Sequence, residues 1–366
     1  MKIIESNTIS EPPVVPLRNE GLLGQLAAIG VLLALILGFF LYAGGWLTPH
    51  ALTPASIVNT FERVAGMHSG FRRNHAKGVC VTGYFESNGQ GQAISKSLVF
   101  LPERVPIVGR FAFAGGQPYA ADSAQTVRSL AILFKLPDGE EWRTAMINIP
   151  VFLVNTPQAF NEFLVVSSPE PATGKVNATA MNAFLSRHPE TAAALKMIGS
   201  HPFSSGFGDS PYFALNAFRF INAGGESVPV RWWVAPEETF SRANSPVTGK
   251  NYLFDALIKQ VHAKPLRWHL FLTVGKPEDP TAQAASPWPP DRRQIDAGTF
   301  TIDSIESEDT SPTRDINFDP LVLPDGIAPS DDPLLSARSA VYSQSFIRRE
   351  GERKSPSAVS PAEVGK

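Results

Sequence analysis

The chain has 366 residues, a formal net charge of −2 and 43% hydrophobic residues, so it has enough apolar material for a core and wholesale disorder is excluded. The near-neutral charge argues against a nucleic-acid partner, which requires a basic surface. The single cysteine, Cys80, excludes an intramolecular disulfide and a cysteine-based zinc or iron–sulfur site.

The chain starts with a polar segment that is followed by a long apolar one. Residues 1–20 contain three prolines among polar residues and predict a flexible tail. Residues 21–46 contain no acidic or basic residue and exceed the roughly 20 apolar residues that cross a bilayer, which predicts a transmembrane anchor. A cleaved signal peptide is the alternative, although the run is long and its Ala-x-Ala sites are poor. Lys2 and Arg18 precede the segment and no basic residue follows before Arg63, which predicts a single-pass membrane protein with a cytoplasmic N-terminus and an extracytoplasmic (periplasmic) domain.

The domain is predicted to cover residues 50–348 and to consist of many strands with helices between them. Apolar alternation and turn residues predict strands at 79–85, 97–101, 110–114, 130–136, 142–153, 213–221, 228–233, 266–273 and 299–305. Helical patterns occur at 55–65, 156–164, 178–186, 191–198 and 251–262. Together they indicate an α+β fold, a closed antiparallel β-barrel with helical insertions. Residues 349–366 are polar and predict a disordered tail.

A further helix predicted over residues 334–346 brings two chemically useful side chains together. Arg338 and Tyr342 are four residues apart and share one helix face. A guanidinium beside a phenol favours the phenolate, which is a rare axial ligand of haem iron. Most such pairs are ordinary surface contacts, so the spacing leaves both interpretations open. His75, taken by itself, is compatible with a structural as well as a catalytic role.

Several segments, in chain order, resemble those of haem catalases. The segment His75–Glu86, HAKGVCVTGYFE, is similar to the distal-histidine segment of that family. The stretch from Gly326 to Tyr342 is similar to the one that ends in the proximal Arg-x-x-x-Tyr. Matches between these two lie at 109–111, 150–152 and 216–226. The resemblance covers roughly residues 55–348, and the chain ends soon after its tyrosine, so it is most similar to the short catalase-related peroxidases.

The resemblance implies a haem b cofactor and assigns three central roles. Tyr342 would be the proximal iron ligand, and Arg338 would hold it as phenolate. His75 would take a proton from bound hydrogen peroxide and return it to the departing oxygen, as base and then as acid. The unperturbed pKa of histidine, near 6.5, suits both tasks. Family members commonly form dimers or larger assemblies, so a homodimer or higher homo-oligomer is also implied.

Further positions correspond to haem-contacting residues of the family. Arg72 and Arg110 are expected to pair with the haem propionates, since buried carboxylates need cationic partners. Arg73 is expected to be a surface arginine. Phe152 and Phe160 match aromatic positions that line the haem or its distal channel.

Two departures from the family pattern bear on the reaction. Alignment on Pro150–Phe152 puts Ile147 where catalases place an asparagine amide, and Asn148, one residue later in a strand, would face the other way unless the register shifts. Ala112 stands where a serine usually orients the distal histidine. Since losing one positioned donor costs about 10²–10³ in rate, weak catalase activity is expected. The predicted function is reduction of hydrogen peroxide with small organic electron donors. Organic hydroperoxides are a further candidate substrate.

Two other functions stay open from the sequence. One is a hydroperoxide isomerase of the allene oxide synthase kind, in which the apolar Ile147 would suit a membrane lipid hydroperoxide. The other is a non-enzymatic haem-binding barrel, which would tolerate replacement of His75. Two smaller expectations are that Cys80 is a small core residue and that the pair Asp331-Asp332 caps the helix that follows it, with a cation site as the alternative.

Overall fold

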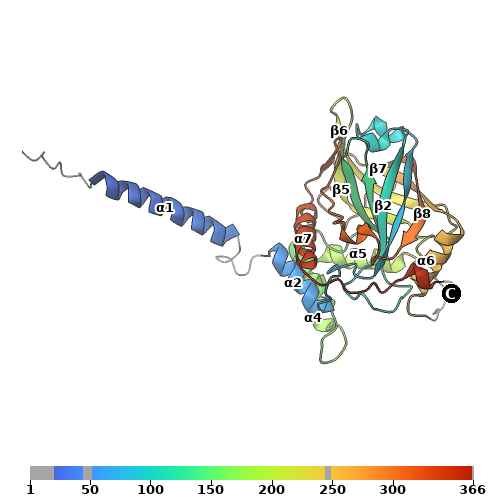
Figure 1. Ribbon diagram of the computed structural model, residues 1–366, viewed down its shortest axis with the longest axis horizontal. Helices are drawn as coiled ribbons and strands as arrows, with labels where there is room; N and C mark the ends of the chain where they lie inside the picture. Colours follow the sequence, from blue (N-terminus) through green and yellow to red (C-terminus); the bar gives the residue numbers. More distant parts are fainter. Residues whose placement is uncertain (1–19, 44–51, 244–248, 365–366) are drawn as a thin grey trace, which may run out of the picture. The chain divides into compact units, whose positions relative to one another are not determined.

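The computed structural model describes residues 20–43, 52–243 and 249–364, and it divides into two units, residues 1–53 and 54–366 (Figure 1). The first unit contains α1 (Glu20–Ala43). Its segment Leu23–Tyr42 has a mean hydropathy of 2.3 and is long enough to cross a membrane. A signal sequence near an N-terminus would have the same length and composition. Residues 1–19 of the predicted tail and residues 44–46 of the predicted anchor lie outside the described residues.

The second unit is built on a closed antiparallel β-barrel of eight strands, as the sequence predicted. The strands are β1 (Gly78–Ser87), β2 (Arg104–Phe113), β3 (Arg128–Lys135), β4 (Glu141–Ile147), β5 (Tyr212–Ile221), β6 (Ser227–Pro236), β7 (Leu266–Val274) and β8 (Arg293–Glu306). They pair in the order β4-β3-β2-β1-β8-β7-β6-β5, and pairing of Ile147 with Phe213 closes the ring. A short strand, β9 (Ile327–Pro329), pairs with β5 outside the ring.

Aromatic side chains fill the barrel, so its interior is a packed core and not a ligand cavity. The rings of Trp142 and Trp232 are both buried, with centroids 5.1 Å apart. Phe111 and Trp268, also buried, have centroids 5.9 Å apart. Backbones approach closely where β1 and β8 form a bulge, since a Cβ on Gly83 would lie 1.9 Å from the Thr301 carbonyl oxygen. Only glycine fits there.

Helices lie outside the barrel, and three of them enclose the space next to it that holds the site. The helices of this unit are α2 (Pro54–Ala65), α3 (Pro157–Val166), α4 (Ala178–Arg187), α5 (Pro189–Ser200), α6 (Tyr252–Ala263) and α7 (Pro333–Glu350). The three that enclose the site are α2, α3 and α7. Both α3 and α7 pack against α2, and Figure 1 shows α2 beside α7. The Thr156 hydroxyl caps α3 by accepting the Ala159 N–H. The turn at 222–225 joins β5 and β6 as a hairpin.

Four local predictions differ from the structure, and one of them is the strand predicted over 299–305, which begins earlier, at Arg293. Residues 97–101 form a 3₁₀ turn, Leu98–Phe100, in which the Phe100 N–H bonds back to the Ser97 carbonyl and the Leu101 N–H to the Leu98 carbonyl, both at 3.1 Å. The strand predicted over 142–153 ends at Ile147, because residues 148–150 bend and Pro150 has no N–H to donate. The strand predicted over 110–114 begins earlier, at Arg104.

The predicted disordered tail, residues 349–366, is instead packed on the domain through residue 364. Val359 is buried in the core. The carbonyls of Pro356 and Ala358 accept hydrogen bonds from the Tyr119 hydroxyl at 2.8 Å and the Asn251 amide at 3.0 Å. The polar composition was misleading because this segment is held through its backbone carbonyls, which a sequence pattern does not reveal.

Candidate active site

A cavity of about 410 Å³ lies between the barrel and the helices α2, α3 and α7. Its volume is within the range of small-molecule and cofactor sites, roughly 300–1,000 Å³. Its wall is largely apolar and includes the residues singled out from the sequence: Arg72, His75, Arg110, Phe152, Phe160, Arg338 and Tyr342. The Phe160 ring lies 5.6 Å from that of Phe152 and 6.0 Å from that of Phe61, measured between centroids. Segments from all parts of the domain therefore converge on one apolar space.

His75 lies in the loop before β1 and is fixed at its ring by a serine that the sequence did not suggest. The Ser129 hydroxyl lies 3.1 Å from His75 Nδ1 and also donates to the Ala112 carbonyl at 3.3 Å. Since the hydroxyl proton is used by Ala112, its oxygen is free to accept Nδ1–H. That arrangement favours the tautomer in which Nε2 carries the lone pair, as a base requires.

Ser129 corrects the expectation that the orienting serine is lost. Ala112 on β2 and Ser129 on β3 are direct partners across the two strands. The hydroxyl that is missing at Ala112 is thus supplied from the adjacent strand. A search of the sequence for Arg-Phe-Ser could not find it, because the strand pairing and not the chain order brings Ser129 to the ring.

The environment keeps His75 neutral. Burial lowers its pKa to about 3, with Arg110 and Arg338 adding positive charge nearby. The ordinary pKa of histidine, near 6.5, was expected from the sequence. In the folded protein His75 is therefore a neutral base over the whole physiological pH range, and the surrounding arginines are the charged groups.

The register next to Pro150 places an apolar side chain in the cavity. Ile147 lines the cavity. The buried side chain of Asn148 instead accepts the Arg128 N–H through Oδ1 at 2.7 Å. No register shift occurs at the end of β4, and its pairing with β3 runs without a break to Ile147 opposite Ser129. The amide is committed to the backbone and an isoleucine faces the site.

Tyr342 and Arg338 lie on α7, one turn apart, as the helical spacing predicted. The Arg338 guanidinium carbon lies 5.9 Å from the centre of the Tyr342 ring. Arg338 donates to the Asn216 side-chain oxygen, and the Asn216 amide donates to Asp332 at 2.7 Å. Asp332 also caps α7 by accepting the Leu334 N–H at 2.9 Å, as expected. The cap of the helix and the orientation of Arg338 are thus linked through Asn216.

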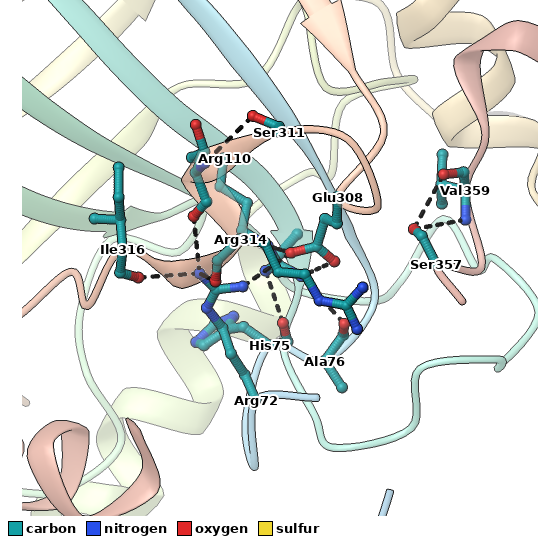
Figure 2. Close-up of polar contacts among 12 residues, drawn as sticks. Arg72, His75, Ala76, Arg110, Glu308, Ser311, Arg314, Ile316, Ser357 and Val359 are labelled. Atoms are coloured by element: carbon teal, nitrogen blue, oxygen red, sulfur yellow. Dashed lines mark hydrogen bonds and ion pairs between the residues drawn. The ribbon is translucent and has the colours of Figure 1, made fainter. Parts of the chain in front are cut away.

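Buried arginines gather at one end of the cavity. Arg72 and Arg110 share the buried carboxylate of Glu308, at 2.8 and 2.7 Å (Figure 2). Arg349 lies near both arginines. Burial, together with the charges of Arg110 and Arg349, lowers the pKa of Arg72 to about 9. Arg349 also lines the cavity, seven residues after Tyr342, although no motif in the sequence pointed to it.

Two arginine expectations differ from the structure. Arg110 lines the cavity, but all three of its side-chain nitrogens donate to Glu308 or to the carbonyls of His75 and Ala76. Arg73, expected at the surface, is buried and pairs with Glu62 and Glu352. A buried guanidinium needs such carboxylate partners. Glu62 is on α2, 11 residues before Arg73, and Glu352 follows α7, 279 residues after it.

The residues around the cavity fit a haem. A macrocycle with an apolar body suits the aromatic wall formed by Phe61, Phe152 and Phe160. Two guanidinium groups share one carboxylate and Arg349 adds a third positive charge, so two further carboxylates would neutralise the cluster. Haem supplies two such groups as propionates. A tyrosine in the same wall adds a side chain of the type that ligates haem iron.

Comparisons with known proteins agree with this geometry. The family model described as Catalase matches residues 51–356. A catalase-related peroxidase of Synechococcus elongatus is 35% identical over 301 residues, which cover 81% of this chain and 89% of that protein. One of Mycolicibacterium paratuberculosis is 29% identical over 82% of this chain and 96% of that protein.

Solved structures show the same fold. A fungal catalase superposes with a TM-score of 0.70 at 19% identity, and a bacterial catalase with 0.68 at 20% identity. Each match covers 80% of this chain but only 61% and 60% of the respective catalase. This chain therefore spans about three fifths of those catalases and most of the length of the catalase-related peroxidases. Catalases bind haem, and by its sequence and its fold this chain belongs to the catalase family.

Proposed function

We propose that this protein is a haem b peroxidase that reduces hydrogen peroxide and organic hydroperoxides with small organic electron donors and has weak catalase activity. The observation that supports it best is the meeting, in one apolar cavity, of His75 with its Nδ1 engaged, Tyr342 beside Arg338, and a buried arginine cluster. The similarity to two catalase-related peroxidases supports the same activity.

His75 would carry the proton chemistry. Its Nε2 would accept the proton of the peroxide O–H and deliver it to the oxygen that leaves as water, or as an alcohol from an organic hydroperoxide. Ser129 would hold the ring and the tautomer through both transfers. The pKa of about 3 fits a base that is neutral before the peroxide arrives. The haem, when bound, would supply the redox chemistry that breaks the O–O bond.

The other residues would bind and orient the cofactor. Tyr342 would ligate the iron, and the Arg338 guanidinium lies one helical turn away, 5.9 Å from the centre of its ring. We assign the propionates to Arg72 and Arg349, because all three side-chain nitrogens of Arg110 already donate to protein acceptors. Within the described residues, the protein hydrogen bonds of Arg72 use Nη1 and Nη2 and that of Arg349 uses Nη1. Phe152 and Phe160 would contact the macrocycle or its access channel.

Ile147 would decide which second reaction follows. Oxidation of a second peroxide, the catalase reaction, needs that peroxide to be oriented, and an isoleucine offers it no hydrogen bond. A small organic donor that delivers electrons at the edge of the cofactor needs no such group. This contrast supports peroxidase activity over catalase activity.

We further propose that α1 attaches the enzyme to a membrane, with the N-terminus in the cytoplasm and the domain on the extracytoplasmic side. The support is the apolar Leu23–Tyr42 segment and the basic residues that precede it. A homodimer or higher homo-oligomer is proposed from the family resemblance.

The test uses the full chain in detergent, loaded with haem and given hydrogen peroxide or cumene hydroperoxide with a phenolic donor. The expected result is donor oxidation with little O₂ release, and a loss of about 10²–10⁴ in rate on His75→Ala. His269→Ala, at a half-buried site on β7 outside the cavity wall, is the matched control and should keep the wild-type rate. Strong O₂ release would contradict the proposal. Equal activity of His75→Ala and wild type would favour a non-enzymatic haem-binding barrel.

A hydroperoxide isomerase is the second candidate, favoured by the apolar Ile147 and the apolar cavity wall. Such an enzyme would rearrange a fatty-acid hydroperoxide without consuming a donor. Product analysis separates the two activities, since an epoxide indicates isomerisation, whereas an alcohol with stoichiometric oxidised donor indicates peroxidase activity.

A further inference from the structure

The backbone at His75 is in a conformation that side chains disfavour. Its φ is 57°, and among the residues that the structure describes it is the one non-glycine residue with positive φ. Left-handed backbone brings Cβ close to the following carbonyl, so such a residue stays there only when its surroundings hold it. His75 is also the residue to which we assign the proton transfers.

Two side chains hold this backbone in place. The Asn74 side-chain oxygen accepts the N–H groups of His75 at 3.0 Å and of Gly115 at 2.7 Å, which ties the loop to the end of β2. On the other side of the residue, Arg110 Nη1 donates to the His75 carbonyl at 2.7 Å. Arg110 Nη2 donates to the next carbonyl, that of Ala76, at 3.1 Å.

Arg110 is itself fixed by a buried carboxylate. Glu308, in the loop after β8, accepts from Arg110 Nε at 2.7 Å and from Nη2 at 3.1 Å, a two-point ion pair in which both side chains are at most 4% exposed. Figure 2 shows the guanidinium between Glu308 and the carbonyls of His75 and Ala76. Space for it exists because residue 78 is glycine, since a Cβ there would lie 2.4 Å from Arg110 Cζ.

We propose that Glu308 is a positioning residue for His75. By holding Arg110 in one orientation, it keeps the His75 carbonyl bonded and the left-handed backbone in place, so that the ring points into the cavity. This inference rests on the proposed role of His75. It differs from charge compensation, in which any negative group near Arg72 and Arg110 would serve equally well.

The test measures cyanide binding to the haem-loaded full chain, because hydrogen cyanide gives up its proton to a base next to the iron when it binds. At equal haem loading, Glu308→Gln should slow cyanide association about 10- to 100-fold, as expected for a base displaced by about 1 Å. The loading is matched because Glu308 also pairs with Arg72, to which we assign a propionate. Glu352→Gln is the matched control, since it removes a carboxylate from Arg73, a buried arginine whose hydrogen bonds go to Glu62, Glu352 and the Phe71 carbonyl. A wild-type association rate in Glu308→Gln would overturn the inference.

Glu308→Asp separates position from charge and serves if Glu308→Gln does not fold. Aspartate keeps the negative charge but is one methylene too short for the two-point pair, so association should remain at least about 10-fold slow. Recovery of the wild-type rate in Glu308→Asp would mean that charge alone matters and would overturn the inference.

His75→Ala sets the reference for both variants. If His75→Ala does not slow cyanide association, the proposed function itself fails. If it does slow association but the Glu308 variants do not, only the inference about Glu308 fails.

Discussion

The two parts of the cavity wall that carry His75 and Tyr342 are built in different ways. Tyr342 is presented by a regular helix, α7, whose periodicity alone sets it one turn from Arg338. His75 is presented by a loop with left-handed backbone. Arg110 bonds the His75 carbonyl and so holds the backbone, and Ser129 contacts the imidazole ring. The helix positions Tyr342 through local geometry, whereas the loop depends on strands that are remote in sequence. Substitutions far from the site should therefore affect the His75 side more than the Tyr342 side.

The largest effect that would sharpen this contrast is expected at Ser129. Ser129→Ala should slow the reaction with peroxide about 10- to 100-fold, because the imidazole loses the contact that fixes its ring and its tautomer. The visible spectrum should stay as in wild type, since Tyr342 is untouched. Stopped-flow kinetics at saturating haem would measure both properties in one sample.

The strand pairing offers a control for Ser129. Because Ala112 and Ser129 are direct partners, Ala112→Ser in the Ser129→Ala background returns a hydroxyl to the same place and should restore most of the rate. An unchanged rate in Ser129→Ala would show that the ring needs no such contact.

A smaller effect, of opposite sign, is expected at Ile147. Ile147→Asn adds an amide to the His75 side of the cavity and should raise O₂ release from hydrogen peroxide about 10-fold, since one positioned donor is worth up to about 10²–10³. Ile149→Asn, at a neighbouring cavity position, is the control for a general effect of polarity. An oxygen electrode gives the measurement, and equal O₂ release from wild type and Ile147→Asn would count against the amide argument.

The smallest effect concerns pH, where almost no change is expected. The pKa of His75 is lowered to about 3, so the neutral base form persists as the pH falls and protonation begins only well below pH 5. The rate of the first reaction with peroxide should therefore be flat from about pH 5 to pH 8. A fall in rate with a midpoint near the ordinary histidine value would mean that bound haem screens the burial and the arginines far more than expected.

The barrel and the Tyr342 side could be predicted from the sequence because both depend on short-range patterns. Alternation identified the strand at 79–85, and helical spacing identified the Arg338–Tyr342 pair. The orientation of Ile147 also followed, since adjacent residues of a strand face opposite ways.

The His75 side could be predicted only in part, because its supports come from distant segments. Glu308 is 198 residues from Arg110, and Ser129 is 54 residues from His75, so no local pattern connects them. The order of the C-terminal segment was missed for the same reason, since Val359 is buried by tertiary contacts that its polar neighbours conceal.

The most direct test of the account is the visible spectrum of the haem-loaded full chain, wild type beside Tyr342→Phe. The account predicts a Soret band with the charge-transfer bands of a tyrosinate-ligated high-spin ferric haem, lost or shifted in Tyr342→Phe and kept in Tyr119→Phe, a change at an exposed tyrosine. A wild-type protein that stays colourless after haem titration, or a Tyr342→Phe spectrum identical to wild type, would contradict it.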